Sequence, residues 1–163
     1  MTRTLAFTAA LLPFIVAPVR APAQLNMNAP AKPKTYVIYA AEPQAIVANK
    51  PATLELRFQV INGYHVNSHT PKSDFLIPTV VTLQPVAGVK PGELQYPHGM
   101  PYSFSFDPGT KLDVYAGTFI VKLPVVASAG EHTIDGSLKY QACDNASCYP
   151  PRTVPLKVLF NAK

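Results

Sequence analysis

The sequence has no tryptophan, only two cysteines and three methionines, and only 14% of its 163 residues are charged. It contains no Gly-rich phosphate loop, no Gly-x-Ser-x-Gly turn and no His-Glu-x-x-His pair. The formal net charge of +5 is mild, and lysine and arginine form no run. These absences argue against a nucleotide-binding enzyme, a serine hydrolase and a zinc peptidase. They also argue against nucleic acid or an anionic membrane as a partner.

The first 23 residues are typical of an export signal. A positively charged start at residues 1–3 precedes the apolar run Leu5–Val16, which is too short to span a bilayer comfortably. Ala21–Ala23 has the small-x-small pattern of a cleavage site, so we expect cleavage before Gln24. The loss of two arginines and no acid lowers the formal charge from +5 to +3. The alternative is an uncleaved membrane anchor. Export places the mature chain in an oxidising compartment, where a cysteine pair is oxidised unless something reduces it.

The mature chain is about the size of one domain. Residues 24–34 are rich in Ala, Pro and Asn and predict a flexible leader, followed by one domain over 35–163. Eighteen prolines and no sustained helical period argue against a helical bundle. Short β-like stretches separated by turn residues predict an all-β fold, an immunoglobulin-like β-sandwich. The expected strands are Thr35–Ala40, Thr53–Ile61, Tyr64–Asn67, Thr79–Leu83, Asp113–Pro124 with a bulge at Gly117, Ile134–Ala142 and Val154–Phe160, with a loop-rich stretch over Pro85–Tyr102.

Both cysteines lie in one stretch near the end of the chain, Tyr140–Pro151. Four residues separate Cys143 from Cys148, and Asp144 is among the turn-forming residues between them. Because an apolar-polar alternation enters this stretch and another leaves it, the pattern predicts a β-hairpin. Cysteines that face each other across an antiparallel pair lie near the separation that a disulfide requires.

Two interpretations of this pair remain open from the residues alone. One is a secreted immunoglobulin-like binding or assembly module with a structural disulfide, which would resist mild reductant. The other is a redox pair, because closing so short a loop contributes only about 2 kcal/mol and closely spaced pairs exchange readily. No Lys, Arg or His lies between the cysteines, and Asp144 beside Cys143 disfavours the thiolate. A thiol of ordinary pKa suits a reductant better than an oxidant.

A copper site is a further alternative. His98-Gly-Met100 has imidazole and thioether groups two residues apart, and His65 and His69 lie upstream. No pattern supplies a full ligand set, and no cysteine, histidine and methionine cluster in the last loop. We therefore expect neither a metal nor an organic cofactor.

The cysteine stretch, with Tyr140-Gln-Ala-Cys143 before the turn and Cys148-Tyr-Pro-Pro151 after it, resembles a known motif. It is similar to the active hairpin of the N-terminal periplasmic domain of the thiol:disulfide interchange protein DsbD. Upstream segments with softer similarity to that family are Gly63–Ser68 with Asp74–Thr79, and Phe104–Gly109 with Leu112–Tyr115. The cysteines here are separated by four residues, whereas the best-known members have five.

The resemblance implies a periplasmic, immunoglobulin-like domain that relays two electrons, and so a thiol-disulfide oxidoreductase domain. Such domains receive electrons from a transmembrane thiol protein, here expected to be a separate chain. The domains pass these electrons to thioredoxin-like proteins that correct disulfides or mature cytochrome c. By this analogy Cys148 attacks the partner disulfide and Cys143 resolves the mixed intermediate, without a cofactor. We expect the protein to act as a monomer.

The resemblance also implies neighbours for the sulfurs. An aromatic cap loop shields the cysteines in the family, and Phe104 and Phe106 are the residues at that place; the alternative is that both are core residues. The family places the segment of His65 and Asn67 beside the sulfurs, where the imidazole could assist proton transfer. The alternative is a solvated surface histidine. Tyr149, next to the second cysteine, is a further expected neighbour.

Overall fold

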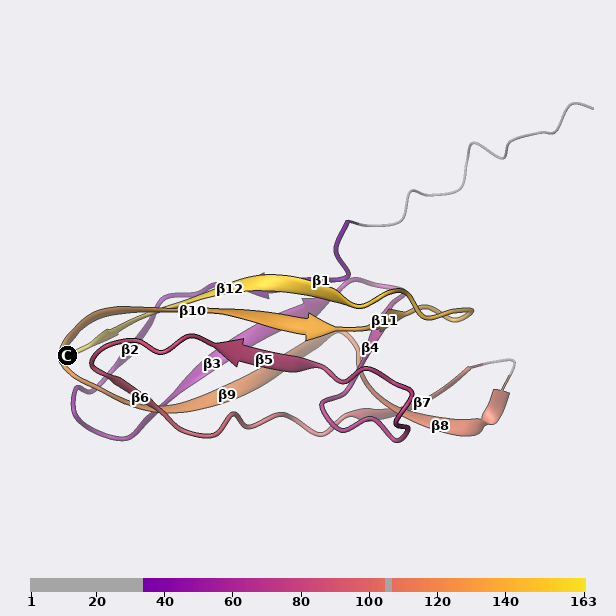
Figure 1. The fold of residues 1–163 in the computed structure, drawn as a ribbon, viewed down its shortest axis with the longest axis horizontal. Coiled ribbons are helices and arrows are strands. Elements are labelled where there is room, and N and C mark those ends of the chain that lie inside the picture. The colour runs from indigo at the N-terminus through magenta and orange to yellow at the C-terminus, as the bar shows by residue number, and fades with distance from the viewer. Residues whose placement is uncertain (1–33, 105–106) are drawn as a thin grey trace, which may run out of the picture. The chain divides into compact units, whose positions relative to one another are not determined.

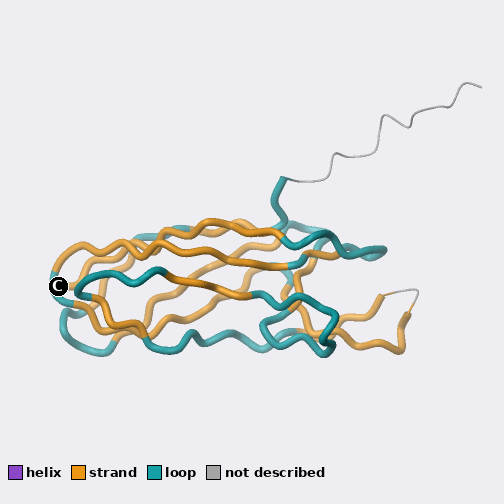
Figure 2. Tube along the Cα trace, in the orientation of Figure 1, coloured by secondary structure: helices purple, strands orange, loops and turns teal. Residues whose placement is uncertain are grey.

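The computed structural model describes residues 34–104 and 107–163 as an all-β fold (Figure 1, Figure 2). The expected signal peptide, nearly all of the expected leader and Phe106 lie outside these residues. Within the described ranges, the chain forms no helix that is long and apolar enough to cross a membrane.

The first sheet is centred on β3 (Ala52–Val60), which alternates apolar and polar residues as the sequence predicts. Leu54 and Leu56 have no exposed surface, and Glu55 between them is exposed. This alternation lets β3 bury one face and pair on both edges. The strand order is β1 (Val37–Ala40), β3, β9 (Thr118–Ala127) and β6 (Val89–Pro91), all antiparallel.

The second sheet is centred on a long hairpin that confirms the two strands expected around the cysteines. Its arms pair without interruption from Gly130↔Ala162 to Tyr140↔Arg152. The strand order is β2 (Gln44–Ile46), β12 (Arg152–Ala162), β10 (Gly130–Tyr140) and β5 (Val80–Leu83). Gly136 allows β5 to approach closely, because a Cβ there would lie 2.5 Å from a backbone oxygen of that strand. The cysteines lie just beyond the Tyr140 end of this hairpin.

The two sheets lie face to face and enclose the hydrophobic core (Figure 1). β3 and β9 supply one side, and β10 and β12 supply the other, with Leu138 and Val158 fully buried. A hydrogen bond of 3.1 Å from the backbone N–H of Tyr36 to the hydroxyl of Tyr140 also connects the sheets. The expected immunoglobulin-like β-sandwich is thereby confirmed.

A third, smaller sheet forms one end of the sandwich, on the right in Figure 1. Its order is β11 (Ala142–Cys143), β4 (His65–Asn67), β8 (Asp107–Tyr115) and β7 (Met100–Phe104). The expected single strand over Asp113–Pro124 was wrong. Gly117, with φ of +64°, lies in a turn that ends β8 and begins β9, so it is not a bulge. The loop-rich stretch before Tyr102 contains β6 and most of β7.

Candidate functional site

The cysteines form a disulfide across a short antiparallel bridge, as their spacing predicts. Cys143 ends β11, Cys148 lies opposite, and their Cα atoms are 3.9 Å apart with an S–S bond of 2.03 Å. Beside this bridge, the backbone N–H of Tyr149 donates to the carbonyl oxygen of Ala142 at 2.8 Å. The disulfide therefore joins the two sides of the loop that connects β10 to β12.

The turn between the cysteines is organised by the carboxylate of Asp144. Its Oδ1 accepts the backbone N–H groups of Ala146 and Ser147, both at 2.8 Å. The backbone N–H of Asp144 donates in turn to the carbonyl oxygen of Ser147 at 3.0 Å. An aspartate that bonds the backbone two and three residues ahead stabilises a tight turn. This local chemistry fixes where the second cysteine returns.

Tyr149 connects the turn to the sandwich. Its hydroxyl donates to Oδ2 of Asp144, and that hydrogen bond, with a smaller contribution from burial, raises the pKa of Tyr149 to about 12. Its ring stacks on Tyr36 with centroids 5.0 Å apart. Tyr149, an expected neighbour of the sulfurs, thus holds the turn against the sandwich.

The two cysteine residues differ in exposure. Cys143 has no exposed surface, whereas Cys148 is exposed. A thiolate that attacks a disulfide must reach one sulfur along the S–S axis, so access decides which sulfur is attacked. Of the two cysteines, Cys148 is therefore the one that presents surface to an approaching molecule.

His65 and Asn67 lie beside the disulfide, on β4. His65 is directly opposite Cys143 in the antiparallel pairing, so their side chains share one face. Only 4% of His65 is exposed, which rules out the alternative of a solvated surface histidine. Burial lowers the pKa of His65, and the nearby charge of Asp144 opposes this shift. Within the described residues, Nε2 of His65 and Oδ1 of Asn67 are buried without a hydrogen-bond partner.

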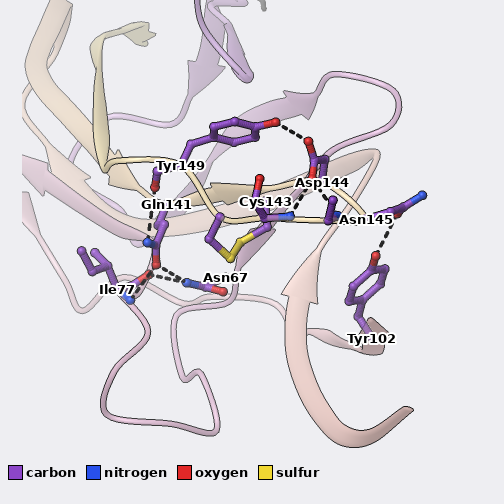
Figure 3. Close-up of a disulfide and its surroundings, with 11 residues drawn as sticks. Asn67, Ile77, Tyr102, Gln141, Cys143, Asp144, Asn145 and Tyr149 are labelled. Carbon is purple, nitrogen blue, oxygen red and sulfur yellow. Dashed lines mark hydrogen bonds between the residues drawn. A yellow bond between two sulfur atoms is a disulfide. The ribbon is translucent and has the colours of Figure 1, made fainter. Parts of the chain in front are cut away.

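Gln141 fastens three segments together next to the disulfide (Figure 3). Its Oε1 accepts the side-chain amide of Asn67 at 3.1 Å and the backbone N–H of Ile77 at 3.3 Å. Its Nε2 donates to the carbonyl oxygen of Tyr149 at 3.3 Å. Sequence reasoning missed this residue. The available signal was its position two residues before Cys143.

An aromatic group covers the β4 side of the site. The ring of Tyr102 lies 3.9 Å from that of His65, and Phe104 lies 6.0 Å from His65 and 5.6 Å from Tyr102, centroid to centroid. The hydroxyl of Tyr102 donates to Oδ1 of Asn145 at 2.9 Å, which connects β7 to the cysteine turn (Figure 3). Phe104 is half-buried in this group and lies outside the sandwich core. Sequence reasoning missed Tyr102, and Phe106 is not among the described residues.

Two of the three histidines considered for copper, His69 and His98, line one cavity, and His65 lies beside the disulfide. His69 stacks on Tyr96 with centroids 3.6 Å apart, and its Nδ1 lies 3.0 Å from the carbonyl oxygen of Thr79. His98 lines an open cavity of about 550 Å³ with His69 and Asp113. Across residues 34–104 and 107–163, no three His, Cys, Asp or Glu side chains are grouped so that they could hold a metal ion.

Comparison with known proteins gives one family match. The family model described as "Thiol:disulfide interchange protein DsbD, N-terminal" matches residues 37–159. No curated protein matches the chain.

The chain is similar to three solved structures. The reduced DsbD N-terminal domain of Neisseria meningitidis is 21% identical, with 72% of this chain and 82% of that chain covered and a TM-score of 0.45. The same domain in complex with the PilB N-terminal domain is 19% identical, with 80% and 88% covered and a TM-score of 0.49. The N-terminal periplasmic domain of ScsB from Proteus mirabilis is 12% identical, with 75% and 44% covered and a TM-score of 0.50.

Proposed function

The chain belongs to the family of the N-terminal domain of the thiol:disulfide interchange protein DsbD, and from this premise we propose that it relays electrons in the periplasm. It performs thiol-disulfide exchange through Cys143 and Cys148. The pair receives two electrons from a separate transmembrane thiol protein and passes them to thioredoxin-like acceptors. The predicted signal peptide over residues 1–23, cleaved before Gln24, supports the periplasmic location. The domain acts as a monomer.

The observation that carries this proposal is the difference in exposure between Cys148 and Cys143. In the reducing half-reaction, a donor thiolate attacks Sγ of Cys148, the S–S bond breaks, and Cys143 leaves as a thiolate that takes up a proton. A second donor thiolate attacks the donor sulfur of the mixed disulfide and releases Cys148. The donor ends as a disulfide, and the pair has gained two electrons.

The second half-reaction runs with the roles of the partners exchanged. The thiolate of Cys148 attacks a disulfide in the acceptor and forms a mixed disulfide, while one acceptor sulfur leaves as a thiolate. Cys143 then gives up its proton and attacks Cys148, which restores the internal disulfide and leaves the acceptor with two thiols. His65 is the side chain that accepts that proton in this proposal, which its place opposite Cys143 in the strand pairing supports.

The aromatic group of Tyr102 and Phe104 serves as a cap over the cysteines, with Phe106 as its expected third member. A reduced pair in an oxidising compartment needs protection from adventitious oxidants until an acceptor arrives. The contacts of Tyr102 and Phe104 with His65, and of Tyr102 with Asn145, support this role. A small oxidant must pass the cap to reach Cys143.

The relay is tested by trapping partners. In Cys143→Ala, Cys148 has no internal partner, so we expect it to hold acceptors in mixed disulfides that appear on a non-reducing gel and are identified by mass. Cys148→Ala is the matched control, because the remaining Cys143 is buried and should capture nothing. Capture of no thioredoxin-like protein by Cys143→Ala, with a wild-type disulfide that resists mild reductant, would show the bond to be structural.

A further inference from the structure

Phe75 is the most exposed large apolar side chain in the described part of the chain, with 96% of its surface accessible. The next is Val47, at 55%. A single exposed apolar residue is ordinary by itself. The position of Phe75 makes it a candidate for binding. Phe75 lies in the loop that joins β4 to β5, here called the Phe75 loop (residues 68–79). This loop is attached to the active site.

The attachment runs through both backbone groups of Ile77. Its N–H donates to Oε1 of Gln141 at 3.3 Å, and its carbonyl oxygen accepts Nδ2 of Asn67 at 3.0 Å. Gln141 also donates to the carbonyl oxygen of Tyr149, the residue after Cys148. The base of the loop is therefore fixed relative to the exposed sulfur by side chains that are themselves part of the site.

The Phe75 loop and the cap lie on different sides of the disulfide. Figure 3 shows Ile77 and Gln141 on one side, and Tyr102 and Asn145 on the other. The Cα atom of Phe75 is two residues from that of Ile77, so at most about 7 Å separates them. A standard protein interface covers about 800 Å² of each partner, a patch of about 16 Å radius. A protein partner seated on Cys148 is large enough to reach the loop.

We propose that Phe75 is the apolar anchor on which a thioredoxin-fold acceptor docks while Cys148 attacks its disulfide. This inference rests on the proposed function and names the docking surface for it. Lys72 and Asp74, which precede Phe75 in the sequence, carry opposite charges, so this part of the loop has no excess charge to attract a charged surface. Aromatic side chains are enriched at the centres of protein interfaces, where their burial supplies affinity. The site thus has one side covered by the cap, at Tyr102, and another side on which the acceptor docks, at Phe75.

The test compares a protein acceptor with a small one. The reduced wild type and Phe75→Ala are each mixed with oxidised thioredoxin and, separately, with oxidised glutathione, and the second-order rate constants are measured. We expect Phe75→Ala to lower the rate with thioredoxin about tenfold and to leave the rate with glutathione unchanged. Because the side chain is almost fully exposed, the variant should keep the melting temperature of the wild type.

Val47→Ala is the matched control. It removes an exposed apolar side chain near the C-terminal residue, where Ala48 bonds Lys163, and should change neither rate. Equal rates for Phe75→Ala and wild type with thioredoxin would overturn the docking role and leave the relay intact. Slowing with both oxidants, or a wild-type dimer that Phe75→Ala dissociates, would also overturn it. A wild type that exchanges with glutathione but never with thioredoxin would overturn both proposals.

Discussion

The body of the sandwich and its cysteine end differ in the regularity of their strand pairing and packing. In the body, β3 pairs with β9 and β10 with β12 in unbroken register, and Leu54, Leu123 and Leu138 have no exposed surface. At the cysteine end β4 and β11 have only three and two residues, the β7–β8 register shifts between Tyr102 and Phe104, and buried polar atoms lack partners among the described residues. Regular strand pairing and packing stabilise the body of the sandwich, and both are less regular at the cysteine end.

This difference separates stability from chemistry. A packed β core supplies the folding free energy, so the disulfide is not needed as a staple and is free to open. Conversely, a buried polar atom without a partner costs stability, about 1–3 kcal/mol for each group. Such groups persist at sites where function requires them. Changes in the body should therefore alter stability alone, and changes at the cysteine end should alter exchange.

The largest effect is expected from Leu138→Ala in β10. Removing a fully buried leucine leaves a cavity and should lower the free energy of unfolding by about 2–5 kcal/mol, measured by urea denaturation. Exchange with a small disulfide should keep the wild-type rate at temperatures where the variant is folded. Lys157→Ala, which removes an exposed ion pair with Asp135, is the control and should cost less than about 1 kcal/mol. A marked change in exchange rate for Leu138→Ala would show that the two regions are coupled.

A smaller effect is expected from the dependence of stability on pH through His65. Burial lowers the pKa of His65 in the folded protein. As the pH falls, the unfolded state therefore binds a proton at His65 before the folded state does. Stability should be unaffected by His65 above about pH 6.5, and should fall as the pH drops below it, by at most about 1.4 kcal/mol per unit. His65→Phe should lose this part of the dependence in urea titrations between pH 4 and 8.

His98→Gln is the control for this measurement, since His98 lies by the open cavity and makes no contact with His65 or Asp144 among the described interactions. Asp144 and the Tyr102 ring are the groups that face the imidazole, and Asp144 favours its charged form. If His65→Phe retains the wild-type slope, another group carries the acid sensitivity. An unchanged pH profile of exchange in His65→Phe would remove its role in proton transfer.

The sequence predicts the body of the molecule better than its site, and the reason is periodicity. Apolar residues at every second position in β3 and on both sides of the cysteines mark buried faces, and the turn-forming residues after Cys143 mark the hairpin end. Strand β2 was missed because three residues paired parallel to β12 leave no local pattern. Gly117 was mistaken for a bulge because a glycine permits both a bulge and a turn.

The site residues that were missed act through long-range contacts. Tyr102 lies in a stretch rich in proline and glycine, and it meets Asn145 only because β7 and the cysteine turn converge in the fold. The contact between Gln141 and Ile77 spans 64 positions in sequence and arises in the same way. His65 and Asn67 were found through the family resemblance, yet their burial depends on the third sheet, in which β4 and β11 are too short to be predicted from alternation.

The smallest effects concern the cap, and they distinguish its two residues. Tyr102→Phe removes only the hydroxyl that binds Asn145, a hydrogen bond that contributes about 0.5–1.5 kcal/mol, so the cap should open more often. Alkylation of the reduced cysteines by iodoacetamide should accelerate severalfold. Phe104→Ala removes the ring that packs on Tyr102 and His65 and should accelerate the alkylation more.

Because Cys148 is already exposed, the faster alkylation should appear at Cys143, which mass spectrometry of the labelled peptides can resolve. Faster labelling confined to Cys148, or none in either variant, would mean that these aromatic side chains fill space beside β4 and protect nothing.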